Sequence, residues 1–505
     1  MVAVAREPGV QAMISHAAAR PGSLFAENEM GAAFEAFTRA YPDFSSTRKL
    51  DELRAREYAR LDRGRHVYLD YTGGGLYAES QLRAHAALLK SEVFGNPHSQ
   101  NLTSLAMTER VERVRASVLK YFNASPDEYL VIFTPNATGA LKLVGESYPF
   151  GPGDRYFLTF DNHNSVNGIR EFARRAGASV RYVPIVPPEL RLDAAALAQA
   201  LGDAAKGANN LLAYPAQSNF TGVQHSLDWI AHAQAQGWDV LLDAAAFAPT
   251  NRLDLGRWHP DFVAISFYKI FGYPTGTGCL LVRKTAAQKL RRPWYAGGTI
   301  TFSSVVGDGH YLTPGPAGFE DGTVNYLSLP AVEVGLKFIE SIGIEVIHTR
   351  VTCLTAWLIG QLLALRHPNG RPVIRLYGPA DTFMRGATVQ VNFFDCDGHL
   401  IDCNDVERIA NRERISLRAG CHCNPGAREV ALGFTREHLA LCFRDKDRLT
   451  FEEFLHVIDG KTTGALRASI GLVTTFADVY KYVRFAERFV GVSRSTNDVR
   501  PLVLV

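Results

Sequence analysis

The sequence predicts an α/β fold, in which a mostly parallel, seven-stranded sheet lies between helices and a smaller α+β domain follows it. Short apolar runs of strand length alternate with longer segments of helical periodicity through the middle of the chain. Beyond about Leu327 this alternation gives way to long amphipathic segments. Polar clusters also follow successive apolar runs, which is where open α/β sheets build their sites.

Seven apolar runs are the candidate strands of the large sheet. They are rich in β-branched and aromatic residues and are bounded by turn-forming residues, as strands are. The runs are Tyr129–Phe133, Arg155–Thr159, Val180–Val183, Asn210–Tyr214, Val240–Asp243, Phe262–Ser266 and Cys279–Val282. Between them we expect helices, for example over Ser165–Ala176 and Asp193–Leu201.

Three parts of the chain are expected. Residues 1–65, which include a charged stretch over Lys49–Arg65, predict a helical arm leading into the sheet, and residues 66–327 predict the large domain. Residues 328–505 predict the small domain, which opens with an amphipathic helix over Leu329–Ile342 and contains the apolar run Thr388–Phe393.

The composition is that of a full-sized enzyme without a nucleic-acid or membrane partner. Of the 505 residues 47% are hydrophobic and 21% are charged, and 54 Lys and Arg against 51 Asp and Glu leave a net charge of only +3. No basic groove interleaved with aromatic residues, signal-like start or run of ~18 uninterrupted apolar residues is present in the sequence. Seven cysteines, a sparse and odd number, indicate reduced thiols, so we expect a cytoplasmic protein.

Lys269 is the first candidate for a catalytic residue. It lies between the predicted strand Phe262–Ser266 and a glycine-rich turn, Gly272–Gly276, at a strand's carboxyl end. A lysine there can lose its proton by desolvation and attack an aldehyde. Taken alone, such a residue is more often a lysine that extends from a strand edge to water.

Four further polar clusters follow strand ends and together indicate a cofactor that carries a phosphate and an aldehyde. Ala137 and Thr138 open a helix whose free N–H groups favour an anion, and Asp243 can pair with a protonated pyridine nitrogen. His163 can stack on an aromatic ring, and Asn219 offers an amide. Each is an ordinary cap or turn residue by itself, but their order along successive strands favours one shared site.

The predicted small domain adds an arginine and a cysteine loop. Arg467 can hold a carboxylate bidentately, and the loop Arg418–Gly426 carries Cys421 and Cys423, which are candidates for nucleophilic attack. Two other interpretations are a pair of buried structural thiols and a zinc site completed by His438 and Cys442. The zinc site is disfavoured, because the Cys-x-Cys spacing is tighter than the usual gap of two residues, and we expect no metal.

With these residues assembled, the chain resembles the class V aminotransferase-like enzymes of fold-type I, which use pyridoxal 5′-phosphate, and within them the cysteine desulfurases. Among these it is most similar to the amino-terminal domain of molybdenum cofactor sulfurases. The resemblance runs from Val67 to Val479, and four stretches carry it: Ser266–Gly276, Phe319–Thr323, Arg418–Gly426, and Ile458–Gly460 leading into Arg467–Gly471.

The resemblance implies a role for each matching residue. Lys269 would bind the cofactor's aldehyde, Asp243 would pair with its ring nitrogen, and His163 would stack on the ring. The phosphate would be held by Thr138, Ser266 and Tyr268, and by Thr323 reaching across a homodimer, while Asn219 and Arg467 would bind the carboxylate of L-cysteine. Cys423 matches the cysteine that forms a persulfide, with Cys421 as its fallback.

Two departures from the family pattern leave alternatives open. Ala246 stands where many desulfurases have Gln, and Tyr268 where many have His, although Tyr is the sulfurase form. The resemblance also leaves the sulfur acceptor open between a molybdenum cofactor on a separate protein, a sulfur carrier protein and a biosynthetic intermediate, and it does not separate sulfur from selenium as the element transferred. The alternative function is another class V activity that does not use Cys423, such as a cystine lyase, an aminotransferase or an epimerase.

Overall fold

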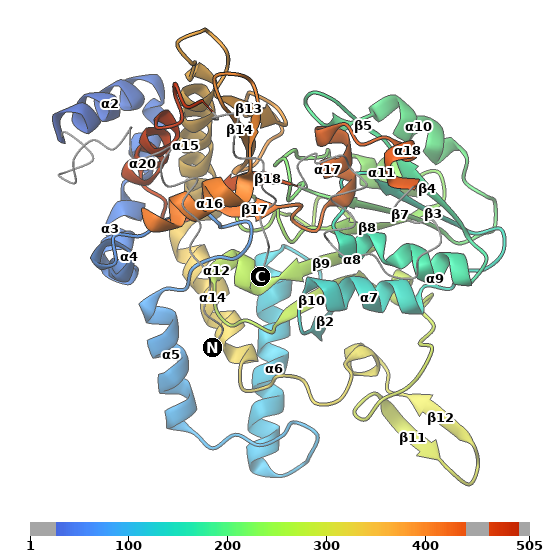
Figure 1. The fold of residues 1–505 in the computed structure, drawn as a ribbon. Helices are drawn as coiled ribbons and strands as arrows, with labels where there is room; N and C mark the ends of the chain where they lie inside the picture. The colour runs from blue at the N-terminus through green and yellow to red at the C-terminus, as the bar shows by residue number, and fades with distance from the viewer. Residues whose placement is uncertain (1–26, 441–463, 494–505) are drawn as a thin grey trace, which may run out of the picture.

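A seven-stranded sheet forms the centre of the protein in a computed structural model that describes residues 27–440 and 464–493 (Figure 1). Its strand order is β2-β10-β9-β8-β7-β3-β4, and β10 alone runs antiparallel to its neighbours. The bounds are β2 Tyr129–Thr134, β3 Arg155–Thr159, β4 Ser179–Val183, β7 Asn210–Pro215, β8 Trp238–Asp243, β9 Phe262–Ser266 and β10 Gly278–Arg283. The predicted fold class is confirmed, and every predicted strand lies within two residues of an observed one.

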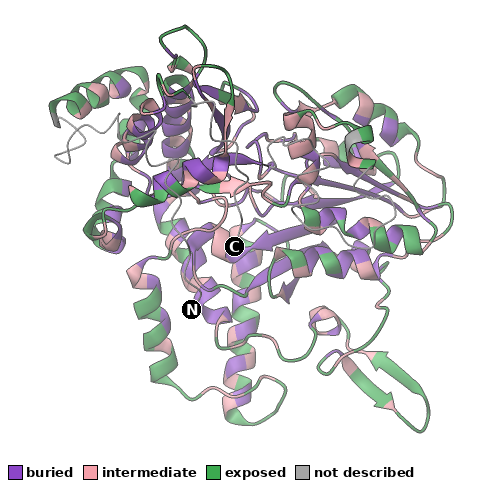
Figure 2. Ribbon diagram, viewed as in Figure 1, coloured by how far each residue is buried: buried purple, intermediate pink, exposed green. Residues whose placement is uncertain are grey.

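Both faces of this sheet are buried, as the continuous apolar runs of its strands require. Successive residues of β8 enter different cores: Val240 and Leu242 pack in the core that includes α6 and α14, whereas Leu241 packs in the core that includes α7 and α9. Figure 2 shows the strands as a buried layer between helices that are exposed on their outer sides. The helix bounds are α6 Leu102–Tyr121, α7 Ala137–Ser147, α8 Asn164–Asn167, α9 Ile169–Arg175 and α14 Leu329–Ile342.

The helix expected over Ser165–Ala176 is two helices, α8 and α9, which meet at Gly168. Gly168 is the C-cap of α8 and the N-cap of α9 and keeps helical backbone angles, so the interruption is confined to this one weak helix former. The helix expected over Asp193–Leu201 is α10 (Ala194–Gly202), with the Asp193 carboxylate accepting the Ala196 N–H at 2.9 Å as its N-cap.

A second sheet of five strands forms the C-terminal region. Its order is β13-β14-β18-β17, with β15 pairing β14 at the side. The bounds are β13 Ile374–Tyr377, β14 Thr388–Phe394, β15 Leu400–Ile401, β17 Arg418–Gly420 and β18 Ala465–Ser469, with helices α15 Ile344–Ala364, α16 Cys403–Arg412, α17 Pro425–Leu432, α18 Arg436–Ala440 and α20 Phe476–Glu487. The predicted helix at Leu329–Ile342 is α14, but it packs on α5, α6 and α12 and so belongs with the large sheet.

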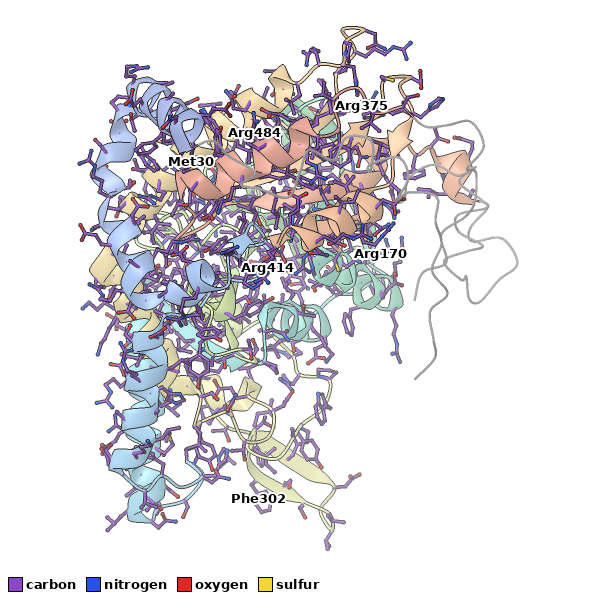
Figure 3. All side chains as sticks on the ribbon, turned by 60° about the vertical axis from the view of Figure 1, so that its left-hand side comes forward. Met30, Arg170, Phe302, Arg375, Arg414 and Arg484 are labelled. Carbon is purple, nitrogen blue, oxygen red and sulfur yellow. The ribbon has the colours of Figure 1, made fainter. Side chains whose placement is uncertain are left out.

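The N-terminal helices pack on the C-terminal region, which differs from the predicted arm leading into the large sheet. They are α2 Glu27–Ala40, η1 Pro42–Thr47, α3 Lys49–Glu57 and α4 Ala59–Arg63. Phe37 contacts the rings of Trp357 and Phe476 at centroid distances of 6.2 and 4.9 Å, and β1 (Val67–Tyr68) pairs in parallel with β16 (Ile415–Ser416). Figure 3 labels Met30 of α2 near Arg484 of α20 on this side of the molecule.

A hairpin of β11 (Ile300–Ser304) and β12 (Gly309–Leu312) extends away from the rest of the molecule (Figures 1 and 3). Phe302, labelled near its far end in Figure 3, is 59% exposed. The remaining elements are α5 Glu79–Ser91, β5 Ile185–Val186, β6 Arg191–Leu192, α11 Trp229–Gln234, α12 Phe267–Phe271, α13 Lys284–Ala287 and η2 Pro316–Phe319.

Within the described residues one helix, α15, has the length and apolar composition of a membrane span. Half of that segment is buried inside the protein, where it packs on η1, α20 and β13. Its Arg350 is fully buried and donates to both carboxylate oxygens of Asp51 at 2.6 Å. These contacts are typical of a core helix.

The contact between the N-terminal helices and the C-terminal region includes a buried ion pair that can be tested. Arg54 Nη1 lies 2.6 Å from Asp478 Oδ2, and the two side chains are 7% and 3% exposed. Because Arg54→Ala leaves the Asp478 charge buried without its partner, we expect it to cost about 3 kcal/mol of stability. Urea unfolding measures this as a lower transition midpoint.

The matched control for this prediction is Arg39→Ala, which removes an exposed pair with Glu35 at 4.0 Å. That change should lie within about 0.5 kcal/mol of the wild type, because exposed pairs contribute little. Equal effects of the two substitutions would show that the buried pair does not hold the two regions together.

Candidate active site

A cavity of about 370 Å³ lies at the carboxyl edge of the large sheet, where the sequence predicts the site. Its walls come from the segments that follow β2, β3, β7, β8 and β9. The lining includes these predicted residues: Ala137, Thr138, His163, Asn219, Asp243, Ser266, Tyr268 and Lys269. The structure therefore brings eight of the predicted site residues together, although they span more than 130 positions of sequence.

Lys269 lies on the short helix α12 (Phe267–Phe271), between β9 and the predicted glycine turn. Gly272 ends this helix with a φ of 82°, and a Cβ there would overlap the backbone of Leu76 and Tyr77, so glycine is required. Behind α12, Gly335 of α14 allows close packing against the ring of Phe271. The helix α12 is thus held between the backbone of Leu76 and Tyr77 on one side and α14 on the other, which fixes the position of Lys269.

The electrostatics of the cavity favour an uncharged amine at Lys269. Desolvation by the surrounding protein lowers the pKa of Lys269, and Asp243 opposes this in part because its negative charge raises the same pKa. The guanidinium groups of Arg467 and Arg418 lower the pKa of Lys269 further. An amine with a lowered pKa is a better nucleophile near neutral pH.

Asp243 ends β8 and is 9% exposed. Its Oδ1 accepts a hydrogen bond from the Ala245 N–H at 3.0 Å, which orients the carboxylate at the strand's end. A buried, oriented carboxylate can stabilise a cation that enters the cavity, including a protonated ring nitrogen.

His163 is the N-cap residue of α8. Its Nδ1 accepts a hydrogen bond from the Ser165 backbone N–H at 3.1 Å and lies 3.0 Å from the Ser165 hydroxyl, so the ring proton belongs on Nε2. Burial lowers the pKa of His163, with Asp243 opposing the shift, and the ring is therefore a neutral imidazole at neutral pH.

One end of the cavity has the chemistry of an anion site. Helix α7 begins there, with Asn136 as its N-cap accepting the Gly139 N–H at 2.9 Å, and the Thr138 and Ser165 hydroxyls lie 2.8 Å apart. The buried hydroxyl of Ser266 has no hydrogen-bond partner among the described residues. An unpaired buried hydroxyl beside a helix N-terminus fits a phosphate, and the lysine and carboxylate deeper in the cavity fit an aldehyde and a pyridine nitrogen.

Gln217 is a cavity residue that sequence reasoning did not single out. It lines the cavity, and its Nε2 donates to the Ala246 carbonyl at 3.0 Å. An amide side chain therefore lies beside Ala246, where many desulfurases carry Gln. Gly386 permits this, because a Cβ at that position would overlap the Gln217 amide. Its position two residues before Asn219 was the available signal.

Arg467 does not line the cavity walls but lies close enough to act on Lys269 electrostatically. Its side chain is 3% exposed, and it donates to the Asn219 carbonyl at 3.0 Å and to Asp70 Oδ1 at 3.1 Å. Burial lowers its pKa to about 10, and the charge of Asp70 opposes this shift. Asp70 was not predicted as a site residue, since only the fold brings it to within reach of residue 467.

Cys423 lies on an exposed loop whose backbone is held at several points. Its carbonyl accepts the Asn164 N–H at 2.7 Å, and Asn219 Nδ2 donates to the His422 carbonyl at 2.7 Å. The next residue, Asn424, donates to the Asp161 carbonyl at 2.7 Å. Gly426 lies against the carbonyl of Phe160, where a Cβ would overlap that oxygen. The thiol is thus presented beside the cavity by a fixed loop.

The neighbouring Cys421 is half-buried, whereas Cys423 is exposed. The predicted structural pair of buried thiols therefore does not describe Cys423. The alternative zinc set includes Cys442, which lies outside the described residues. His422 is flanked by the two cysteines, and burial lowers its pKa well below the usual range.

Thr323 lies outside this cavity. It lines a neighbouring cavity of about 380 Å³ with Glu320 and Asn325, and its hydroxyl accepts a hydrogen bond from Asn96 Nδ2 at 3.3 Å. It therefore cannot be grouped with Ser266 and Tyr268 in one chain's own site.

Comparison with known proteins finds a family match over most of the chain. The model of the aminotransferase class-V family matches residues 67–482. A molybdenum cofactor sulfurase from Solanum lycopersicum is 37% identical over 501 residues, which cover 91% of this chain but 60% of that protein, so the chain spans less than two thirds of its relative.

Two solved structures share the fold at lower identity. A cysteine desulfurase from Thermococcus onnurineus matches with a TM-score of 0.70 and 24% identity, covering 87% of this chain and 97% of that one. A cystine C–S lyase in complex with its product cysteine persulfide matches with a TM-score of 0.64 and 18% identity, covering 84% and 98%. With its lysine-bearing α/β site and a family match over most of its length, this chain belongs to the aminotransferase class-V family.

Proposed function

We propose that this chain is a cysteine desulfurase that uses pyridoxal 5′-phosphate, converts L-cysteine to L-alanine, and carries the released sulfur on Cys423. The observation that supports this most directly is the position of the exposed Cys423 thiol on a fixed loop close enough to interact electrostatically with Lys269 in the cavity. The names of the relatives, cysteine desulfurase and molybdenum cofactor sulfurase, support the same reaction.

The cavity residues would hold the cofactor at three points. Lys269 would hold the aldehyde carbon, Asp243 the ring nitrogen, and Thr138, Ser266 and Tyr268 the phosphate at the start of α7. His163 would cover the ring. When bound, pyridoxal 5′-phosphate supplies an aldehyde that condenses with amines and a conjugated ring that takes up the electrons released at the substrate's Cα.

The chain's own residues would bind the substrate and transfer the proton and the sulfur. Arg467 would bind the carboxylate of L-cysteine, with Asn219 beside it, and so orient the Cα–H bond. The Nζ of Lys269 would remove the Cα proton and return a proton later, and the burial that lowers its pKa favours the uncharged amine that this step needs. The Cys423 thiolate would attack the substrate's sulfur: a sulfur–sulfur bond forms, the carbon–sulfur bond breaks, and reprotonation leaves alanine.

We propose a molybdenum cofactor as the sulfur acceptor, since the relative from Solanum lycopersicum carries that cofactor in its name. A sulfur carrier protein is the alternative acceptor. In either case the exposed thiol of Cys423 would be the group that the acceptor meets.

The first test separates a desulfurase from a lyase or aminotransferase. Purified protein loaded with pyridoxal 5′-phosphate should form alanine from L-cysteine. Cys423→Ala should reduce that rate at least about 10³-fold, the scale on which loss of a nucleophile acts, while keeping the cofactor absorbance. Lys269→Ala should lose the reaction and bind the cofactor weakly.

Cys396→Ala is the matched control, because Cys396 is a half-buried cysteine whose neighbour Asp397 pairs with Ser493, away from the cavity. It should keep the wild-type rate. Full activity in Cys423→Ala, or pyruvate in place of alanine, would replace the persulfide mechanism with a lyase reaction.

The pKa shift of Lys269 gives a second prediction. The uncharged amine should be present at lower pH than in a free lysine, because burial lowers its pKa. The rate at which the apoprotein captures pyridoxal 5′-phosphate should therefore reach half its maximum at a pH below the pKa of a free lysine. Stopped-flow absorbance over a pH series measures this rate.

Asp243→Asn tests the direction in which Asp243 shifts the pKa of Lys269. It removes the negative charge that raises the pKa of Lys269, so the midpoint should move to still lower pH. A midpoint at the value for free lysine, or one that rises in Asp243→Asn, would contradict the electrostatic account.

We further propose that the chain works as a homodimer in which Thr323 completes the phosphate site of the partner subunit. The location of Thr323 outside its own chain's cavity supports this. Light scattering should give twice the mass of one chain. Mixing Lys269→Ala with Thr323→Ala chains should restore activity above that of either variant alone, because mixed dimers contain one intact site, and a lack of restoration would argue against shared sites.

A further inference from the structure

Two arginines lie side by side on neighbouring strands next to the cavity. Arg418 of β17 is the register partner of Arg467 of β18 in their antiparallel pairing. Like charges in directly opposed positions repel each other, so such a pair needs a counter-charge. Both groups act on the same site, since each lowers the pKa of Lys269.

Asp70 supplies that counter-charge to both arginines at once. It follows β1 and forms a bridge with Ser469 at the end of β18. Arg418 donates from Nε to its two oxygens at 3.1 and 3.0 Å and from Nη2 to Oδ2 at 2.6 Å. Arg467 Nη2 donates to Oδ1 at 3.1 Å. Two guanidinium groups and one carboxylate leave the cluster with a single positive charge.

The two arginines differ in how many of their guanidinium N–H groups Asp70 occupies. Arg467 is buried, and its Nε has no hydrogen-bond partner among the described residues. Arg418 directs both Nε and Nη2 at Asp70 and has a side chain that is 49% exposed. Asp70 therefore leaves Arg467 able to accept a further anion, while it occupies Arg418.

Arg418 also begins the segment that ends in the reactive cysteine, since it lies five residues before Cys423. Arg467, Arg418 and Cys423 all lie close enough to act electrostatically on Lys269, so a substrate whose carboxylate binds Arg467 and whose side chain reaches Cys423 would lie within the field of Arg418. If Arg418 were free, it would attract a second anionic group on the substrate's side chain.

We propose that Asp70 is a specificity-determining residue, which neutralises Arg418 so that the site selects amino acids with one carboxylate and disfavours those with an anionic side chain. This inference rests on the proposed function, in that Arg467 is taken to bind the α-carboxylate of the substrate. It assigns Asp70 a role in substrate choice and none in the transfer of protons or sulfur.

Affinities for L-asparagine and L-aspartate test the inference, because the two ligands share their shape and differ in one charge. They are titrated into protein loaded with pyridoxal 5′-phosphate, and the dissociation constants are taken from the change in cofactor absorbance. The wild type should prefer L-asparagine by about tenfold, the size of one screened charge interaction over several ångströms. Asp70→Asn should remove this preference by strengthening L-aspartate binding.

A double variant tests the charge balance. Asp70→Asn combined with Arg418→Gln again leaves one positive charge, from Arg467, so the preference for L-asparagine should return. Asp62→Asn is the matched control: it removes a carboxylate that pairs with Arg54 far from the cavity and should leave the ratio unchanged. Melting temperatures identify variants that do not fold.

If Asp70→Asn does not fold, Arg418→Gln alone tests the same idea, since it leaves Asp70 and Arg467 with no net charge. It should weaken L-asparagine binding about tenfold. Equal changes in both affinities in Asp70→Asn would overturn the specificity role and leave Asp70 a structural residue. A wild type that binds neither these ligands nor L-cysteine, or whose L-cysteine affinity is unchanged by Arg467→Ala, would instead overturn the proposed function and this inference with it.

Discussion

The parallel pairing of β3, β7, β8 and β9 is the constraint on which the rest of the site depends. In the register of these strands Pro215 lies opposite Asp243, and Asp243 lies opposite Ala264, so the segments that follow each strand emerge at one edge. His163, Asn219, Asp243 and Lys269 meet there because their strands end together. Asp243 ends its strand, whereas Lys269 lies on the short helix α12 and His163 caps α8, so each is within a few residues of the end of a buried strand.

The C-terminal region depends on the same edge, because its functional segments are attached to it by hydrogen bonds. Asn219 is the main junction: its carbonyl accepts from Arg467, its Nδ2 donates to the His422 carbonyl, and its Oδ1 accepts from Asn424. One residue that follows β7 thus positions both the arginine and the cysteine loop. A shift of this strand end would therefore displace Arg467 and the cysteine loop together.

The strands of the large sheet could be predicted from the sequence because their signals are local. Each is a short apolar run bounded by turn residues, and the site residues follow those runs directly. The pairing of β1 with β16 joins residues almost 350 positions apart, and no pattern near Val67 indicates its partner. The packing of Phe37 against Trp357 and Phe476 also could not be predicted, because these residues lie far apart in the sequence.

The same distinction explains which site residues were missed. Lys269 and Asp243 lie close to the end of a strand, which the sequence indicates. The role of Asp70 depends on Arg418 and Arg467, which are far from it in the sequence. Gln217 was not predicted because the segment that follows β7 was expected to supply one amide to the site, that of Asn219. The extra helical turn that carries Lys269 was missed because five residues are too few for a helical period to be visible in the sequence.

The fixed backbone of the cysteine loop has a consequence for the proposed transfer of sulfur. A loop held by Asn164, Asn219 and Asn424 cannot swing its thiol outward over a long distance. In the proposed function, the acceptor would therefore have to come to Cys423 with its sulfur-accepting atom at or near its own surface. A molecule whose reactive atom lies at the bottom of a deep, narrow pocket would be excluded by shape alone, whatever its chemical affinity for sulfur.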